Sequence, residues 1–344
     1  MLKTLFLAAT LLAGAATSCN AGALGVRDIR IAGSPEGRAL FAVVWYPTSD
    51  TRKTAPVAEN PAFLGVPAIR DAGIGAGTHP LVVLSHGYGG SWRNLSWLAG
   101  ELAARGYIVA APDHPGTTTF DRSAAEAAKP WERPRDLSRL IDALLEDGDI
   151  ADRIAADRIA VIGHSLGGWT AAALAGARFD AERFAADCTM NTSPRACSLT
   201  AELGLDGTGA GRQKLEGELG DPRIGAFVSL DLGLARGFSP ESLAALRVPA
   251  LVIAAGTDIG DMPAERESGY LARALPAASS TYVVIPDAMH FSFLQVCKPG
   301  AAERIEAETP GDGIVCKDGG IRGRAAIHRE VADRILAFLA VSLP

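Results

Sequence analysis

Short apolar runs alternate with amphipathic segments along most of this chain. The runs that predict strands are rich in Val, Ile, Leu and Ala and cover residues 28–33, 40–47, 80–86, 107–114, 158–163, 224–231, 250–258 and 280–288. Segments with helical spacing follow, at residues 92–106, 133–148, 166–175, 239–247, 264–275 and 325–343. Apolar strands that alternate with helices are typical of a mostly parallel sheet with helices on both faces.

One region departs from this alternation. Residues 178–222 are polar and Gly-rich and show little periodicity. We therefore expect an irregular insertion there that caps or borders a functional site.

The chain has 344 residues, of which 48% are hydrophobic, and a formal net charge of −6. This length and composition fit one large α/β domain over residues 22–344. The negative charge argues against nucleic acid or an acidic membrane surface as the main partner. The oligomeric state is not indicated.

The first residues have the layout of a cleaved export signal. Lys3 precedes the apolar run "TLFLAATLLAGAA", which is shorter than the ~20 residues needed to span a bilayer, and small residues follow it. We predict that residues 1–21 are removed and that the mature chain, without a transmembrane segment, is periplasmic or secreted. The alternative is a lipoprotein anchored at Cys19, although Ala16 stands where such signals usually have leucine.

The remaining cysteines form two local pairs in turn-rich segments. Cys188 and Cys197 enclose one short stretch, and Cys297 and Cys316 enclose another. In an exported chain this arrangement predicts two disulfides, with free buried thiols as the alternative. The spacing does not suit zinc, and no metal site is expected.

The stretch "RIAVIGHSLGGWTAAALA" contains the strongest chemical signal. It places Ser165 between glycines where an apolar run gives way to helical spacing. A Gly-x-Ser-x-Gly turn between a strand and a helix presents the serine hydroxyl at the carboxyl edge of the sheet. We interpret Ser165 as a nucleophile rather than an N-capping serine.

A serine needs a base to remove its proton, and the base needs a third group to orient it. His290, in "PDAMHFSFL", follows the last predicted strand and is the expected base. The other histidines are assigned to supporting or unrelated places: His86 and His164 in the motif loops, His79 before a strand, His114 after one, and His328 on the surface of the last helix.

Two aspartates compete to orient His290. Asp258 ends the penultimate predicted strand, the commonest place for this acid, and we favour it. Asp231 ends the preceding strand and is the alternative, while Asp261 and Asp287 on neighbouring loops are weaker candidates.

The backbone N–H groups of Leu166 and Tyr88 are the expected oxyanion donors. Leu166 directly follows the serine, and Tyr88 lies in the glycine-rich "HGYGG" loop after an apolar strand. No dinucleotide or Walker-type phosphate motif is present, so no cofactor is expected.

These stretches together resemble the α/β-hydrolase superfamily, in particular bacterial predicted dienelactone hydrolases related to the secreted platelet-activating-factor acetylhydrolases. The resemblance runs from about residue 25 to the end and implies an esterase or lipase-type fold, a Ser–Asp–His triad and no cofactor. True dienelactone hydrolases use cysteine, so that substrate does not transfer to a chain with Ser165. The acetylhydrolases have their acid at the position of Asp231, whereas the general hydrolase pattern matches Asp258.

The sequence therefore predicts an exported serine esterase acting on short-chain acyl or phospholipid-type esters. An amidase or peptidase of the same fold, or a non-catalytic binding protein that retains the hydrolase shell, are the alternatives. Five aromatic residues near the motif loops could line a substrate pocket or belong to the core: Trp92, Trp131, Trp169, Phe291 and Phe293.

Overall fold

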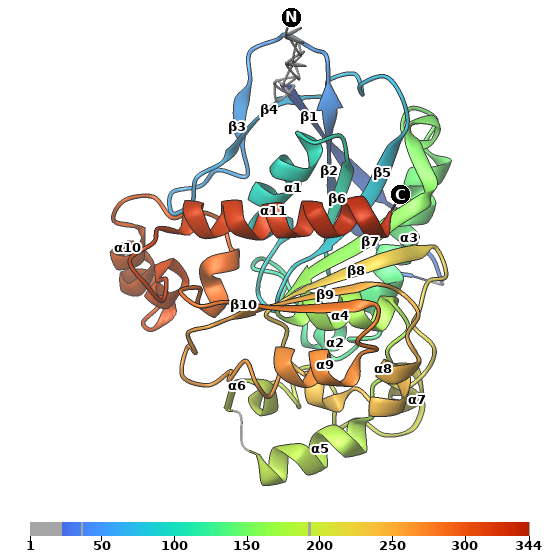
Figure 1. Ribbon diagram of the computed structural model, residues 1–344, viewed down its shortest axis with the longest axis vertical. Coiled ribbons are helices and arrows are strands. Elements are labelled where there is room, and N and C mark those ends of the chain that lie inside the picture. Colours follow the sequence, from blue (N-terminus) through green and yellow to red (C-terminus); the bar gives the residue numbers. More distant parts are fainter. Residues whose placement is uncertain (1–22, 36, 192–193, 344) are drawn as a thin grey trace, which may run out of the picture.

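The computed structural model describes residues 23–35, 37–191 and 194–343. The predicted signal peptide, Cys19 included, lies outside the described residues. Figure 1 shows the sheet crossing the middle of the molecule. Its strands are β1 (Ala23–Ile31), β2 (Leu40–Thr48), β3 (Ala55–Val57), β4 (Val66–Arg70), β5 (His79–Ser85), β6 (Ile108–Asp113), β7 (Ile154–His164), β8 (Ile224–Leu230), β9 (Ala250–Ala255) and β10 (Ser280–Ile285).

The described strands pair in the order β10-β9-β8-β7-β5-β6-β2-β1-β4-β3. Strands β6, β5, β7, β8, β9 and β10 run parallel to one another, and β2 is antiparallel to both β6 and β1. This confirms the predicted mostly parallel sheet. Strands β3 and β4 were not predicted, because each offers too few alternating positions to show a pattern.

Helices cover both faces of the sheet, as the pattern predicted. Helices α1 (Ser96–Ala103) and α11 (Arg324–Ser342) lie on one face, while α3 (Glu132–Glu146), α4 (Leu166–Leu174), α8 (Pro240–Ala245) and α9 (Ser268–Ala274) lie on the other (Figure 1). Successive strand residues alternate between the two cores: Leu81 and Val83 face α3 and α4, whereas Val82 and Leu84 face α1 and α11. Burial on both faces explains why these strands have continuous apolar sequences.

The segment 178–222 is more helical than its sequence suggested. It contains α5 (Ala181–Met190), α6 (Pro194–Ser198) and α7 (Gly209–Leu215). The Asp180 side chain caps α5 by accepting from the N–H of Arg183 at 2.8 Å, and Phe184 anchors the helix in the core. These helices are too short to produce a long apolar stripe, so the periodicity did not reveal them.

The remaining elements are short or peripheral. They are α2 (Ala124–Ala127), α10 (Ala301–Glu308) and five 3-10 turns: η1 (Trp92–Leu95), η2 (Ala151–Arg153), η3 (Ala235–Gly237), η4 (His290–Phe293) and η5 (Asp312–Cys316). In the described part of the chain, none of the helices has the length and apolar character needed to cross a membrane.

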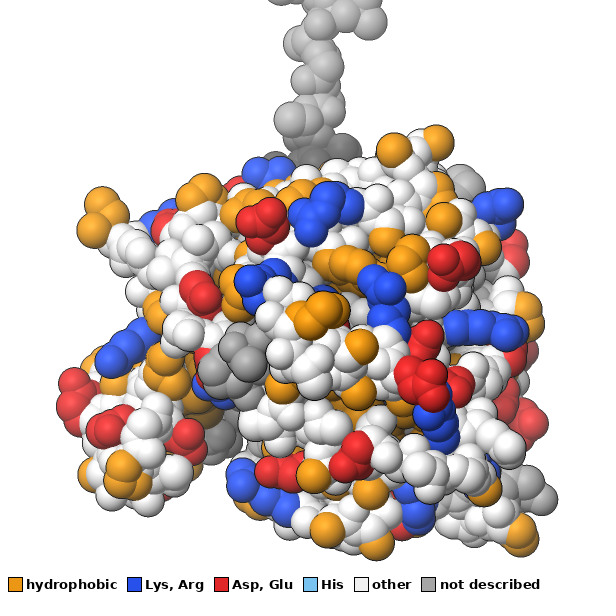
Figure 2. Space-filling model, turned by 90° about the horizontal axis from the view of Figure 1, so that it is seen from below, with side chains coloured by type: hydrophobic (Ala, Val, Ile, Leu, Met, Phe, Trp, Pro, Cys, Tyr) orange, Lys and Arg blue, Asp and Glu red, His pale blue; other side chains and the backbone are white. Residues whose placement is uncertain are grey.

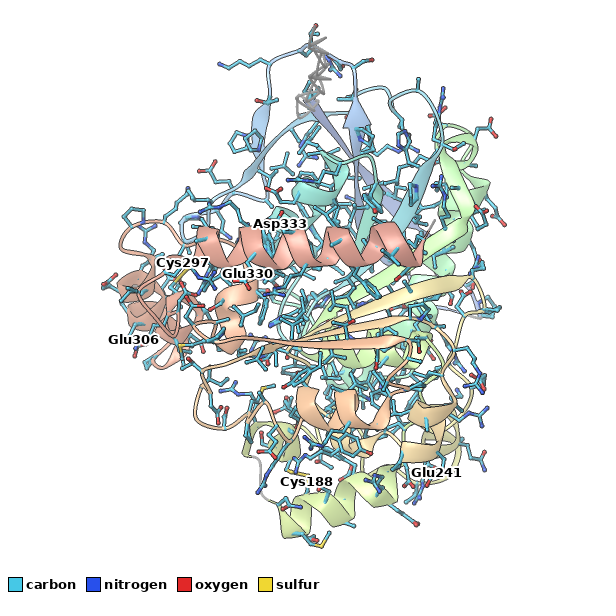
Figure 3. All side chains as sticks on the ribbon, in the orientation of Figure 1. Cys188, Glu241, Cys297, Glu306, Glu330 and Asp333 are labelled. Carbon is cyan, nitrogen blue, oxygen red and sulfur yellow. A yellow bond between two sulfur atoms is a disulfide. The ribbon has the colours of Figure 1, made fainter. Side chains whose placement is uncertain are left out.

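Both predicted disulfides are confirmed. Cys188 pairs with Cys197, which joins α5 to α6, and Cys297 pairs with Cys316, which joins the loop after η4 to η5. Figure 3 shows Cys188 on α5 and Cys297 near α10, in different parts of the molecule. Each disulfide thus closes a local loop outside the sheet.

Candidate active site

Ser165 occupies a sharp corner between β7 and α4. Its backbone has φ 57° and ψ −121°, a region that L-residues rarely adopt. The Ser165 N–H donates to the Leu230 carbonyl at 3.0 Å, and the Ser165 carbonyl accepts from the N–H of Gly168 at 2.9 Å. These bonds to β8 and α4 hold the strained conformation in place.

The glycines beside this corner are required by close backbone contacts. A Cβ at Gly163 would lie 1.8 Å from the Gly167 carbonyl oxygen, and a Cβ at Gly167 would lie 1.9 Å from the Ser85 carbonyl oxygen. The strand, the helix and the neighbouring β5 can therefore approach one another only with glycine at both positions. This close packing is the physical basis of the Gly-x-Ser-x-Gly pattern.

His290 is the first residue of η4, in the segment that follows β10. Its ring is buried, and Nδ1 lies 2.7 Å from Oδ2 of Asp231. The other carboxylate oxygen of Asp231 accepts from the N–H of Ala255 at 2.9 Å. Asp231 is thus fixed between the ends of β8 and β9, with one oxygen directed to His290.

Asp258 does not take the place that we favoured for it. Strand β9 ends at Ala255, so Asp258 lies in the loop beyond the sheet, where its side chain is exposed. Its Oδ1 accepts from the N–H groups of Gly260 and Met262 at 3.0 and 2.9 Å, which closes its own loop. The preference for Asp258 therefore disagrees with this geometry, and the alternative, Asp231, is the residue beside His290.

The two weaker candidates are engaged elsewhere. Oδ1 of Asp261 lies 2.9 Å from Nε of Arg195, and Asp287 pairs with Arg322. Neither contact involves His290.

His164 and His86 support the backbone of the site, as their positions in the loops suggested. Burial, together with the neighbouring His290, holds the pKa of His164 well below its usual range, so the ring is neutral. Its Nε2 then donates to the His290 carbonyl at 2.9 Å. In the same way Nδ1 of His86 bonds the Gly87 carbonyl at 2.7 Å.

His328 is not on the surface, which corrects our expectation. It lies on the buried side of α11, is 6% exposed, and stacks on Trp97 with ring centroids 3.7 Å apart. Burial lowers its pKa to about 3, and its Nε2 lies 2.9 Å from the Ser292 carbonyl. His328 therefore supports the turn that carries His290 without reaching Ser165.

Ser165 and His290 open into one cavity of about 560 Å³. Tyr88 and Leu166, the expected oxyanion donors, also line it, and Leu166 provides the first N–H of α4, which has no partner within the helix. The other lining residues are Arg122, Arg195, Ala196, Ser198, Leu199, Glu202, Gly233, Leu234, Asp261, Met262 and Phe291. Of the five aromatic residues considered above, Phe291 alone lines this cavity, and the others are buried.

The insertion forms one wall of this cavity. The Tyr88 hydroxyl donates to Glu202, and Arg195 pairs with Asp261 in the loop after β9. Burial and Glu202 raise the pKa of Tyr88 to about 12, so the hydroxyl keeps its proton. Figure 2 views the molecule from the side of α5 and shows charged side chains of both signs dispersed over that face, so no field of one sign dominates it.

The sequence reasoning missed two buried polar clusters. One surrounds Arg133 in α3, and the other joins Arg236 to Asp187 and Glu267 behind the end of β8. Helical spacing could have revealed the first, because Arg133 lies four residues before the buried Leu137 on the apolar face of α3. The described residues contain no group of three or more His, Cys, Asp or Glu side chains arranged to hold a metal.

The curated relatives share about a third of their length with this chain. A cutinase (est1) from Thermobifida alba is 35% identical over 105 residues, which are 30% of this chain and 32% of that protein. A bis(hydroxyethyl) terephthalate hydrolase from Streptomyces coelicolor is 33% identical over 92 residues, 27% of each chain.

The fold is shared with a solved structure. A ferulic acid esterase from Streptomyces cinnamoneus superimposes with a TM-score of 0.65 at 23% identity, over 96% of this chain and 92% of that one. Residues 82–302, which include the serine corner and His290, match the sequence model of the alpha/beta hydrolase family. With this match and the sheet described above, the chain belongs to the alpha/beta hydrolase family.

Proposed function

We propose that this protein is an exported serine hydrolase that cleaves carboxylic esters through Ser165, His290 and Asp231. The observation that carries the proposal is the buried Asp231–His290 pair, whose histidine lines the same cavity as the strained Ser165. A nucleophile, a base and a group that orients the base are the parts required for acyl transfer.

The reaction follows from these positions. Nε2 of His290 takes the Ser165 proton as Oγ attacks the ester carbonyl, while the Nδ1–H bond to Asp231 fixes the tautomer and stabilises the imidazolium. The N–H groups of Tyr88 and Leu166 bind the oxyanion of the tetrahedral intermediate. His290 then protonates the leaving alcohol, and a water molecule releases the acid from the acyl-enzyme by the same steps.

Esters are favoured as substrates by the names of the relatives. These are cutinases and a terephthalate ester hydrolase. Aromatic and polymeric esters therefore stand beside short-chain acyl and phospholipid-type esters as candidate substrates. The finer resemblance to dienelactone hydrolases and platelet-activating-factor acetylhydrolases supports the phospholipid-type esters and an acid at Asp231. An amidase or peptidase activity, or binding without catalysis, are the alternatives.

Export is part of the proposal. The two disulfides favour an oxidising compartment, periplasmic or extracellular. Sequencing the N-terminus of the mature protein checks the predicted removal of residues 1–21 and separates it from lipid attachment at Cys19.

The test combines covalent labelling with a substrate panel. A fluorophosphonate probe should label Ser165, and p-nitrophenyl esters of graded chain length, a short-chain phospholipid, an aromatic diester and an anilide should rank the substrates. Ser165→Ala should abolish labelling and lower kcat by ~10⁶ while the thermal unfolding curve is retained. A wild-type protein that resists the probe supports a binding protein instead, and preferential cleavage of the anilide supports an amidase.

A further inference from the structure

Arg133 is a buried guanidinium close to the candidate active site. It is 1% exposed in the first turn of α3, and none of the ion pairs among the described residues includes it. Its Nε donates to Oγ1 of Thr170 at 3.0 Å, and its Nη1 donates to Oγ1 of Thr117 at 2.5 Å. Its Nη2 donates to the His86 carbonyl and to Oγ of Ser85 at 3.2 Å.

These acceptors lead to both backbone segments that carry the expected oxyanion donors. The Thr170 hydroxyl, which accepts from Arg133, donates in turn to the Leu166 carbonyl at 2.9 Å. On the other side, the His86 carbonyl lies two residues before Tyr88 in the glycine-rich loop. A single planar guanidinium thus connects the first turn of α4 with the loop after β5.

Thr117, another acceptor of Arg133, connects the guanidinium to the far side of that loop. The Thr117 hydroxyl donates to the His114 carbonyl at 3.1 Å, and the Thr117 carbonyl accepts from the N–H of Gly89 at 3.0 Å. Gly89 has φ +69°, so the loop turns directly after Tyr88. Arg133 therefore fixes the loop on both sides of Tyr88.

A chain of buried polar side chains orients Ser85, another acceptor of Arg133. Ser85 lies 3.0 Å from Nε2 of His114, whose Nδ1 bonds Asp136 at 2.8 Å, and Arg38 pairs with Asp136 at 2.7 Å. Burial, with Arg133 nearby, holds the pKa of His114 well below its usual range, so Nε2 of the neutral ring accepts a hydrogen bond from the Ser85 hydroxyl. The Ser85 oxygen is then free to accept from Arg133.

Burying a charge is costly, and apolar residues of similar volume often fill such a site with no loss of stability. A guanidinium in this position instead provides donors in a fixed plane that no apolar side chain can replace. Burial lowers the pKa of Arg133 to about 9, so these donors stay charged at neutral pH.

We propose that Arg133 is a positioning residue that aligns the backbone N–H groups of Tyr88 and Leu166 for the oxyanion. This inference rests on the proposed function. Arg133 touches neither Ser165 nor His290; it acts through the backbone that surrounds the developing charge. Its loss should weaken binding of the transition state more than binding of the substrate.

The experiment compares Arg133→Met and Arg133→Lys with the wild type on a p-nitrophenyl ester and on a trifluoromethyl ketone, which forms a tetrahedral adduct with the serine. Arg133→Met should lower kcat by about a hundredfold, the loss typical of one oxyanion donor, with KM changed less than threefold. Affinity for the ketone should fall by the same factor as kcat. The kcat of Arg133→Lys should lie between those of the wild type and Arg133→Met, because lysine keeps the charge without the planar array of donors.

Two further variants keep the test decisive. Arg223→Met serves as the control and should keep wild-type kcat. Arg223 pairs with Asp142 of α3 at 2.6 Å, and its other hydrogen bonds among the described residues go to Asp221 and Ser138. If Arg133→Met does not fold, Thr170→Val tests the inference instead. Valine keeps the shape of the threonine side chain and removes the hydrogen bond to the Leu166 carbonyl, so kcat should fall about tenfold.

The outcomes distinguish failure of the proposed function from failure of the inference about Arg133. A wild type that neither labels nor hydrolyses any ester overturns the proposed function, and the inference with it. An active wild type whose Arg133→Met variant changes KM alone, or keeps its affinity for the ketone, overturns the inference while the proposed function stands.

Discussion

The ends of β8 and β9 lie side by side, and each is followed by an aspartate that sequence patterns connect with catalysis. Asp231 follows β8 directly with φ 44°, is 4% exposed and bonds across to β9 and to His290. Asp258 lies beyond β9, is exposed and bonds the N–H groups of its own loop. The difference teaches that a strained, buried corner supported by neighbouring strands can bring an aspartate to His290, whereas the motif at the strand end does not guarantee that contact.

The support behind the two corners differs as well. Behind β8, the buried Glu267 accepts from the N–H of Ala235 at 2.8 Å, and Arg236 joins the same cluster. The loop after β9 is held by Arg195 at the surface. Substitutions at three positions test this contrast between the two corners.

The largest effect is expected at Asp231. Asp231→Asn should lower kcat by ~10⁴ with an intact fold, because an amide favours the wrong tautomer of His290. Steady-state kinetics with circular dichroism checks this. A loss below tenfold would show that His290 does not depend on Asp231, and the contrast between the two corners would then lose its functional meaning.

A smaller effect, on stability, is expected behind β8. Burial raises the pKa of Glu267 to about 7, against an ordinary value of 4.5. Because the folded state holds this proton more tightly than the unfolded chain does, the associated stability is complete below pH 4.5 and is lost as the pH rises towards 7. The difference in unfolding free energy between wild type and Glu267→Gln should therefore change by ~3 kcal/mol between pH 4.5 and 8.

Urea denaturation across this range measures that difference. Glu303→Gln, on the exposed side of α10, is the control and should show no such trend. A difference between wild type and Glu267→Gln that does not vary with pH would mean that Glu267 titrates as an ordinary carboxyl, and the corner after β8 would then lack its distinct electrostatic support.

The smallest effect is expected at Asp258. Asp258→Asn should keep kcat within threefold of wild type, and Asp258→Ala should lower the unfolding free energy by ~1 kcal/mol, through loss of the bonds to Gly260 and Met262. Kinetics and thermal unfolding of both variants suffice. If Asp258→Asn instead lowered kcat by orders of magnitude, our sequence-based preference for Asp258 would be restored.

Much of the fold was readable because the central strands are buried on both faces and so appear as uninterrupted apolar runs. Ser165 and His290 could be found for a related reason: local geometry constrains the residues around the serine, and the position of His290 after β10 follows from chain order. These features can be recognised from a short stretch of sequence.

The acid could not be chosen in this way. The apolar run before Asp258 ends at Ala255, and only Gly256 and Thr257 separate it from the aspartate, so our prediction extended β9 to Asp258, whereas the chain leaves the sheet at Gly256. Which carboxylate reaches His290 depends on how strand ends align in space. Arg133 and His328 are different: each lies in register with the apolar face of its helix, and the same periodicity that predicted α3 and α11 could have predicted their burial.

The segment that forms one wall of the cavity is tied to the corner after β8. Ala196 and Leu199 line the cavity, and the disulfide between Cys188 and Cys197 braces the segment locally. The same segment places Phe184 in the core and pairs its Asp187 with Arg236, behind the corner that carries Asp231. A redesign of the cavity can therefore vary the lining side chains one by one, whereas replacing the whole segment would also remove packing and charge on which the neighbouring corner depends.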